Sequence, residues 1–188
     1  MEVRKVGVVG LGAMGAGIAQ LCVEAGVETV GREVTDELGA AARDRIAHFL
    51  TRKVEKGTLE QDARDAAVAR LSLTTEVGDL ADCDLVIEAI VEELGPKREL
   101  FAELDRITAP DAVLATNTSA LSVTEIAAAT QRPERVVGMH LARLEAHTAV
   151  GRLLERLPGL RLDPARPSAP AGLVFRKPPE LHVLWSTT

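Results

Sequence analysis

The sequence predicts an α/β fold in which a doubly wound parallel sheet carries helices on both faces. Short apolar segments rich in β-branched residues alternate with helical patterns along the first 140 residues. This alternation is typical of parallel strands joined by right-handed crossovers. In addition, the segment LVIEAIV at residues 85–91 is almost continuously apolar, as expected for a strand that is covered on both faces.

Composition excludes several classes of protein and divides the chain near residue 140. The net charge of −6 argues against a nucleic-acid partner. Because we find no run of 18 apolar residues and no leader pattern, we expect no membrane span, no signal peptide and a cytoplasmic location. Residues 1–140 carry fifteen basic and twenty-four acidic residues (−9), whereas residues 141–188 carry seven and four (+3) and six of the nine prolines. We therefore expect a domain at 1–140 and an irregular tail at 141–188.

The expected elements follow one another in the order that this fold requires. Strands are expected at residues 6–9, 28–33, 71–75, 85–91, 113–116 and 136–139, and helices from the glycine turn to 25 and at 35–56, 58–71, 97–107 and 122–129. Thr35 is a suitable N-cap, and Thr58-Leu59-Glu60-Gln61 matches a capping box. The two helices at 35–56 and 58–71 are thus predicted to form an antiparallel pair inserted after the second strand.

A glycine-rich turn follows the first strand and opens the first helix. Its sequence, Gly10-Leu11-Gly12-Ala13-Met14-Gly15, is the G-x-G-x-x-G motif in the strand–turn–helix context that binds dinucleotides in Rossmann folds. We expect Gly10 to permit the tight turn, Gly12 to let a pyrophosphate approach the backbone, and Gly15 to let the helix pack on its strand. The helix N-terminus would supply free N–H groups for the phosphates.

The end of the second strand indicates which dinucleotide would bind. Glu33 would accept hydrogen bonds from the ribose hydroxyls and would repel a 2′-phosphate, which predicts NAD. The guanidinium of Arg32 could instead pair with a 2′-phosphate, so NADP stays open as the alternative.

Polar residues follow the later strands, at the sheet edge where doubly wound folds bind ligands. Glu92 and Lys97 come after the strand at 85–91, Asn117 and Ser119 after the strand at 113–116, and His140 after the last strand. An imidazole titrates near neutral pH, which suits a general base that takes a hydroxyl proton. Ser119 could hydrogen-bond the same oxygen. No cluster of residues has metal-ligand spacing, so no metal is expected.

With these residues in view, residues 3–140 resemble the 3-hydroxyacyl-CoA dehydrogenases, in particular the 3-hydroxybutyryl-CoA branch. The resemblance rests on VGVVGLGAMGAG at 6–17, DLVIEAIVEE at 84–93, KRELFAELD at 97–105, TNTSAL at 116–121 and RPERVVGMH at 132–140. It implies that NAD contacts Gly10, Gly12, Gly15, Glu33, Glu92, Lys97 and Asn117. It further implies an acyl-CoA substrate with Ser119 on the 3-oxygen and His140 as the base, and a helical pair that helps hold CoA, with Lys53 and Lys56 as candidates for its phosphates.

After His140 the sequence departs from that family. The family continues with an Asn and with a Glu that orients the imidazole, and these positions are Arg143 and Arg152 here. The family's helical C-terminal domain, which closes over the acyl group and forms the homodimer, is not expected in this chain. Two functions therefore remain open, a 3-hydroxyacyl-CoA dehydrogenase and a catalytically impaired NAD-binding module.

The tail has a resemblance of its own. Residues 138–188 are similar to the C-terminal end of a haem-thiolate cytochrome monooxygenase, but Val136 occupies the position of the iron-binding cysteine, so no haem is expected. We interpret the tail as the product of a fusion or rearrangement. Residues 146–157 are predicted to form an amphipathic helix, whose apolar face would either pack on the sheet or dock a partner.

Overall fold

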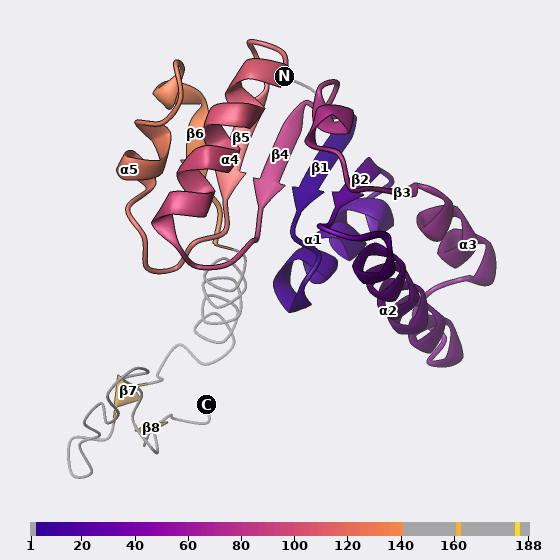
Figure 1. Ribbon diagram of the computed structural model, residues 1–188. Helices are drawn as coiled ribbons and strands as arrows, with labels where there is room; N and C mark the ends of the chain where they lie inside the picture. Colours follow the sequence, from indigo (N-terminus) through magenta and orange to yellow (C-terminus); the bar gives the residue numbers. More distant parts are fainter. Residues whose placement is uncertain (1–2, 141–160, 163–182, 185–188) are drawn as a thin grey trace. The chain divides into compact units, whose positions relative to one another are not determined.

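The chain divides into two units, residues 1–141 and 142–188. The computed structural model describes residues 3–140, 161–162 and 183–184. In the first unit the described residues form a six-stranded parallel sheet with the order β3-β2-β1-β4-β5-β6 (Figure 1). In the second unit, β7 (Arg161–Leu162) pairs with β8 (Val183–Leu184) in antiparallel fashion. The helix expected at residues 146–157 lies outside the described residues.

The elements of the first unit alternate as the sequence predicts. The strands are β1 (Lys5–Val9), β2 (Glu28–Arg32), β3 (Leu71–Thr74), β4 (Leu85–Glu88), β5 (Val113–Thr116) and β6 (Val136–Gly138). The α-helices are α1 (Ala13–Glu24), α2 (Asp36–Glu55), α3 (Gln61–Ala69), α4 (Leu94–Ile107) and α5 (Val123–Ala127), with short 3-10 helices η1 (Val77–Leu80) and η2 (Pro133–Arg135). The expected pair of helices between the second and third strands is present as α2 and α3, which pack against each other (Figure 1).

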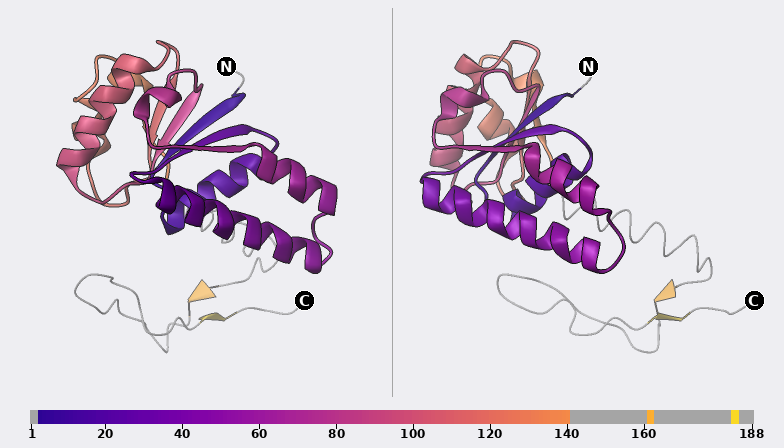
Figure 2. Two further views of the ribbon diagram at one scale, coloured as in Figure 1. Left: turned by 45° about the vertical axis from the view of Figure 1, so that its right-hand side comes forward. Right: turned by 90° about the vertical axis from the view of Figure 1, so that its right-hand side faces the viewer.

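The sheet is wound in two directions from β1. The chain builds outward through β2 to β3, and then returns to place β4 on the other side of β1. Helices α1, α2 and α3 cover one face of the sheet, and α4 and α5 cover the other (Figure 2). The prediction of a doubly wound parallel sheet is therefore confirmed, and the change of direction between β1 and β4 is where such sheets bind ligands.

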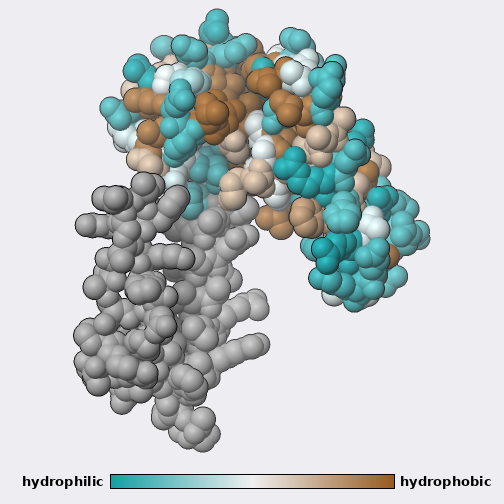
Figure 3. All heavy atoms as spheres, turned by 60° about the horizontal axis from the view of Figure 1, so that its bottom comes forward, coloured by the Kyte–Doolittle hydropathy of each residue, from teal (hydrophilic) through white to brown (hydrophobic). Residues whose placement is uncertain are grey.

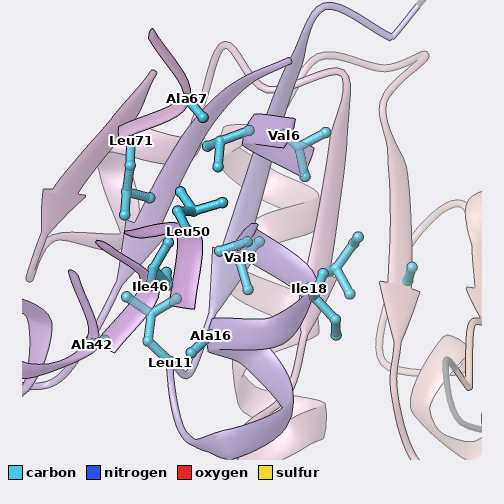
Figure 4. Close-up of a cluster of buried hydrophobic side chains, with 14 residues drawn as sticks. Val6, Val8, Leu11, Ala16, Ile18, Ala42, Ile46, Leu50, Ala67 and Leu71 are labelled. Atoms are coloured by element: carbon cyan, nitrogen blue, oxygen red, sulfur yellow. The ribbon is translucent and has the colours of Figure 1, made fainter. Parts of the chain in front are cut away.

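Burial of apolar side chains on both faces holds this arrangement together. On the first face, α2 presents Ala42, Ile46 and Leu50 at intervals of four residues, so that they form one stripe toward the strands (Figure 4). On the second face, Phe101 and Leu104 of α4 are fully buried. Because both faces are covered, the strand residues read as apolar runs rather than as alternating patterns.

Two local expectations were wrong. The capping box expected at Thr58 is absent, because the Thr58 hydroxyl donates to the carbonyl oxygen of Lys53 and α3 begins only after Glu60, which makes no side-chain cap. The strand expected at residues 85–91 ends at Glu88. There the side-chain Oε1 accepts the N–H of Ile90, two residues further along the chain, at 2.7 Å, so this N–H is bonded to a side chain and not to a neighbouring strand.

No helix among the described residues is both long enough and apolar enough to cross a membrane.

Candidate functional site

The glycine turn between β1 and α1 forms the floor of the candidate site. Gly10 has a φ of +86°, and a Cβ at this position would lie 2.7 Å from the carbonyl oxygen of Ala89. A Cβ on Gly15 would overlap the carbonyl oxygen of Gly10. A Cβ on Gly12, in contrast, would meet no atom within 4 Å. The turn therefore needs glycine at two positions for its own packing, and at the third it leaves open space beside the N-terminus of α1.

The carboxylate of Glu33 is hydrogen-bonded to the backbone of this turn. Its Oε1 accepts the backbone N–H of Leu11 at 2.6 Å, and its Oε2 accepts the N–H of Val34 at 3.1 Å. The neighbouring Arg32 is directed elsewhere, since its Nε donates to the carbonyl oxygen of Thr75 at 3.1 Å. The structure thus brings the acidic residue, and not the adjacent guanidinium, onto the glycine turn.

Lys97 lies in a buried ionic network at the end of β4. Its side chain is only 1% exposed, and its Nζ lies 2.5 Å from Glu88 Oε1 and 3.2 Å from Glu92 Oε2. The second oxygen of Glu88 accepts the Thr116 hydroxyl at 2.7 Å. The structure therefore brings Glu92 and Lys97 together in one ionic network that also contains Glu88.

Glu92 connects this network to the turn after β5. Its Oε1 accepts the Thr118 hydroxyl at 2.5 Å and the backbone N–H groups of Ser119 and Ala120 at 3.1 and 3.3 Å. Partial burial acts to raise the pKa of the Glu92 carboxyl, but the hydrogen bond from Thr118 and the positive charge of Lys97 outweigh it and hold the pKa below its ordinary value. The carboxylate is therefore charged at neutral pH and holds the backbone of Ser119.

Ser119, Asn117 and His140 follow two neighbouring strands. Strands β5 and β6 are parallel, with Thr116 opposite Gly138. Ser119 is exposed three residues after β5, and His140 is partly buried two residues after β6. The backbone N–H of Asn117 donates to the carbonyl oxygen of Glu88 at 2.9 Å. All three residues thus follow the carboxyl ends of the strands, as the sequence predicts.

Sequence reasoning missed the residues that support this edge from below. Glu88 and Thr118 are buried and bind the predicted residues Lys97 and Glu92, respectively. The buried Thr116 in turn binds Glu88, and the sequence pattern singles out none of these three residues. The available signal was Glu88 itself, the one charged residue within the apolar run at 85–91.

Several apolar side chains at the same edge remain exposed, namely Met14, Val34, Leu38 and Val91, and they offer surface to the flat rings of a dinucleotide.

A hollow lies over α1 and α2, away from the glycine turn. It has a volume of about 380 Å³ and is lined by Gln20, Phe49, Arg52, Lys53 and Lys56. The ammonium of Lys53 is paired with the carboxylate of Glu24. The far end of the α2–α3 pair is covered by hydrophilic side chains, as seen in Figure 3, where the edge at which the strands end is turned toward the viewer.

Comparison with known proteins agrees with this geometry. Residues 5–145 match the family described as "3-hydroxyacyl-CoA dehydrogenase, NAD binding domain". A 3-hydroxybutyryl-CoA dehydrogenase of Mycobacterium tuberculosis is 49% identical over 139 residues, which are 73% of this chain and 49% of that protein. The crystal structure of M. tuberculosis FadB2 superposes with a TM-score of 0.73 at 48% identity, covering 74% of this chain and 50% of that one.

A third similar protein comes from another genus. The crystal structure of (S)-3-hydroxybutyryl-CoA dehydrogenase PaaH1 from Ralstonia eutropha gives a TM-score of 0.72 at 36% identity, with 74% of this chain and 49% of that chain covered. The chain thus spans about half the length of the relatives it matches. The strand order, the glycine turn and the match over residues 5–145 lead to one conclusion: the chain belongs to the family of 3-hydroxyacyl-CoA dehydrogenase NAD-binding domains.

Proposed function

We propose that the chain binds NAD and takes part in the oxidation of a short-chain 3-hydroxyacyl-CoA at C3, or in the reverse reduction. The observation that carries this proposal is the glycine turn, which is open at Gly12 and bonded by its Leu11 N–H to Glu33. An open helix N-terminus with a carboxylate beside it suits a pyrophosphate and the adjoining ribose hydroxyls. The names of the similar enzymes from M. tuberculosis and R. eutropha supply the class of substrate.

The charges around the turn favour NAD over NADP. The Glu33 carboxylate would repel a 2′-phosphate placed on the adenosine ribose. Arg32 would be the group to neutralise that phosphate, but its Nε is used by the carbonyl oxygen of Thr75. That bond leaves only the Nη groups of Arg32 for a phosphate, whereas the Glu33 carboxylate lies on the glycine turn itself, so the free-energy difference favours NAD.

His140 is the proposed general base, and Ser119 the proposed hydrogen-bond donor to the 3-oxygen. In the oxidation, His140 would take the proton of the C3 hydroxyl. A bound nicotinamide would supply the acceptor for the C3 hydride. Ser119 steadies the oxygen as the carbonyl forms. Its backbone is already held by Glu92 at 3.1 Å, so the hydroxyl is presented from an ordered turn.

The hollow over α1 and α2 is the proposed contact for the phosphates of CoA. Of the two candidate lysines, Lys53 is already paired with Glu24, which favours Lys56. Arg52 adds a second cation to the same lining, and Phe49, which is 48% exposed, adds an aromatic surface. An adenine could stack on that ring while its phosphates meet the cations.

A second function is favoured by the residues after His140. The resemblance to the family assigns the orienting carboxylate to the position of Arg152, and loss of such a carboxylate costs roughly four orders of magnitude in rate in other histidine-based sites. The alternative is therefore a module that binds NAD with little or no turnover.

A titration followed by a turnover assay separates the two functions. NADH is titrated into the full chain by calorimetry, and acetoacetyl-CoA is then added while NADH oxidation is followed at 340 nm. Turnover that His140→Gln abolishes and His48→Gln retains supports the dehydrogenase, since His48 is an exposed histidine of α2. Binding without turnover selects the module. If NADH does not bind at millimolar concentration, both functions are wrong.

A further inference from the structure

Glu88 occupies a central place at the edge of the sheet where the candidate site lies. It is the last residue of β4 and lies opposite Val9 of β1 on one side and Thr116 of β5 on the other. Its side chain is fully buried. The carboxylate nevertheless has three donors, namely the Lys97 ammonium at 2.5 Å, the Ile90 N–H at 2.7 Å and the Thr116 hydroxyl at 2.7 Å. One side chain therefore ties together β4, β5, the β4–α4 loop and the first turns of α4.

A continuous path of charged hydrogen bonds leads from Glu88 to Ser119. The Lys97 ammonium that binds Glu88 also lies 3.2 Å from Oε2 of Glu92. The other oxygen of Glu92 accepts the backbone N–H groups of Ser119 and Ala120. If the Lys97 ammonium moved, the Glu92 carboxylate would move with it, and so would the Ser119 backbone that this carboxylate holds.

The energetics of burial indicate what this arrangement does. A buried ion pair is a weak source of stability, because the cost of removing both charges from water offsets most of their attraction. Removing one partner, however, leaves an uncompensated charge. Without the charge of Glu88, the ammonium of Lys97 would be left with Glu92 alone, whose side chain is 42% exposed. The ammonium would then move toward the Glu92 carboxylate and toward water. It would compete with the Ser119 and Ala120 N–H groups for that carboxylate.

We propose that Glu88 is a positioning residue, which holds the turn at residues 118–120 in place through Lys97 and Glu92. The inference rests on the proposed function, because that function gives Ser119 its contact with the substrate oxygen. Glu88 itself is buried beneath the edge and acts only through other side chains. The position of Lys97 in the sheet edge, and with it the order of the Ser119 turn, depends on the charge of Glu88.

The test compares two variants at this network with a matched control in the full chain. Glu88→Gln keeps the shape of the side chain and removes its charge. Thr116→Val leaves both charges but removes one neutral donor to Glu88 and also the acceptor of the Thr118 N–H, so this variant is judged at the Ser119 and Ala120 amides alone. The control is Asp105→Asn, which disrupts the Asp105–Arg132 ion pair at 2.7 Å. That pair is also largely buried, with side chains 6% and 11% exposed, but Asp105 is near the opposite end of α4. Each protein is examined by hydrogen exchange of residues 117–121, NADH affinity and urea unfolding.

We expect faster exchange in residues 117–121 of Glu88→Gln, and NADH affinity lower by about tenfold, under conditions in which the amides of β1 and β5 stay protected. Thr116→Val should shift the exchange of the Ser119 and Ala120 amides and the NADH affinity in the same direction but less. Asp105→Asn should lose stability without changing either. A folded Glu88→Gln with parental exchange at 117–121 overturns the proposal, as does an equal effect of Asp105→Asn on that segment.

Two further outcomes are distinguished by the same set of proteins. If Glu88→Gln does not fold, Thr116→Val decides: parental exchange of the Ser119 and Ala120 amides, which bond Glu92, overturns the proposal, and faster exchange of these two amides with a protected core supports it. If the parent chain fails to bind NADH, the proposed function is wrong, whereas the exchange comparison still decides whether Glu88 orders the Ser119 turn.

Discussion

Alanine substitutions at three glycines of α1 and its N-cap should separate the packing of the turn from its binding function. At Gly15 a Cβ would overlap the carbonyl oxygen of Gly10, so the helix would have to move away from the turn. Overpacking of this kind costs about 1–3 kcal/mol, and it outweighs the gain of about 1 kcal/mol from replacing a helical glycine. Gly15→Ala should therefore lose both stability and NADH affinity.

The other two positions are controls for each other. At Gly17, inside α1, a Cβ would meet nothing within 4 Å, so Gly17→Ala should gain about 0.5–1 kcal/mol from helix propensity. At Gly12 the added methyl also meets nothing, and the φ of −58° suits any L-residue. Gly12→Ala should keep its stability to within about 1 kcal/mol yet lose about tenfold or more in NADH affinity, because the methyl would occupy the space of the pyrophosphate.

Stability is best followed by circular dichroism in urea, since the one tryptophan, Trp185, lies outside residues 3–140. NADH affinity is measured by calorimetry on the same preparations. The reasoning is refuted if Gly15→Ala unfolds at the parental urea concentration. The proposed role of the turn is refuted separately if Gly12→Ala binds NADH as tightly as the parent does.

Three further predictions follow from the charges and thiols. Glu33→Ser should shift the ratio of NADPH to NADH affinity toward NADPH by about tenfold, because the carboxylate that repels a 2′-phosphate is gone; an unchanged ratio in calorimetry would contradict this. Burial raises the pKa of the Cys83 thiol to about 11 and raises that of Cys22, so at pH 8 both should react slowly with Ellman's reagent until urea is added; rapid labelling of the native chain would count against it. The pKa of Glu92 is lowered from 4.5, so the contribution of its ionised form to stability is present above that value and is lost as pH falls through the lowered pKa. The difference in unfolding free energy between the parent and Glu92→Gln should therefore be constant at neutral pH and shrink in acid. A difference that grows in acid would contradict this role of the ionised carboxylate.

The sheet and its helices could be predicted because each element carries its own local signal. The run LVIEAIV at 85–91 has the composition of a strand that is covered on both faces. Gly10 and Gly15 indicate a turn, and the structure shows that only glycine fits at these two positions. Glu33 was predictable for the same reason, since its distance from the turn is set by one helix and one strand. These features depend on neighbours close in sequence, and the structure confirms the elements that they predict.

Helix caps and strand ends were less predictable, because they depend on which of several backbone groups a side chain bonds to. Thr58 has the residues around it for a capping box, but its hydroxyl takes the nearby Lys53 carbonyl instead. The strand β4 stops three residues early, and the Ile90 N–H is bonded to the Glu88 side chain and not to a neighbouring strand. In both cases a side chain bonds to the backbone in a way that the residue pattern alone does not specify.

The burial of Lys97 shows why the support of the site was not visible in the sequence. A lysine near the start of an exposed helix is usually solvated, and its partners lie five and nine residues earlier, at Glu92 and Glu88, which is no helical or strand repeat. Those partners come within reach only because the chain leaves β4 at Glu88 and re-enters a helix at Leu94. A charged residue inside an otherwise apolar parallel strand is nevertheless costly unless it is paired. Glu88 therefore predicts that a buried cation exists nearby, even though it does not predict which one.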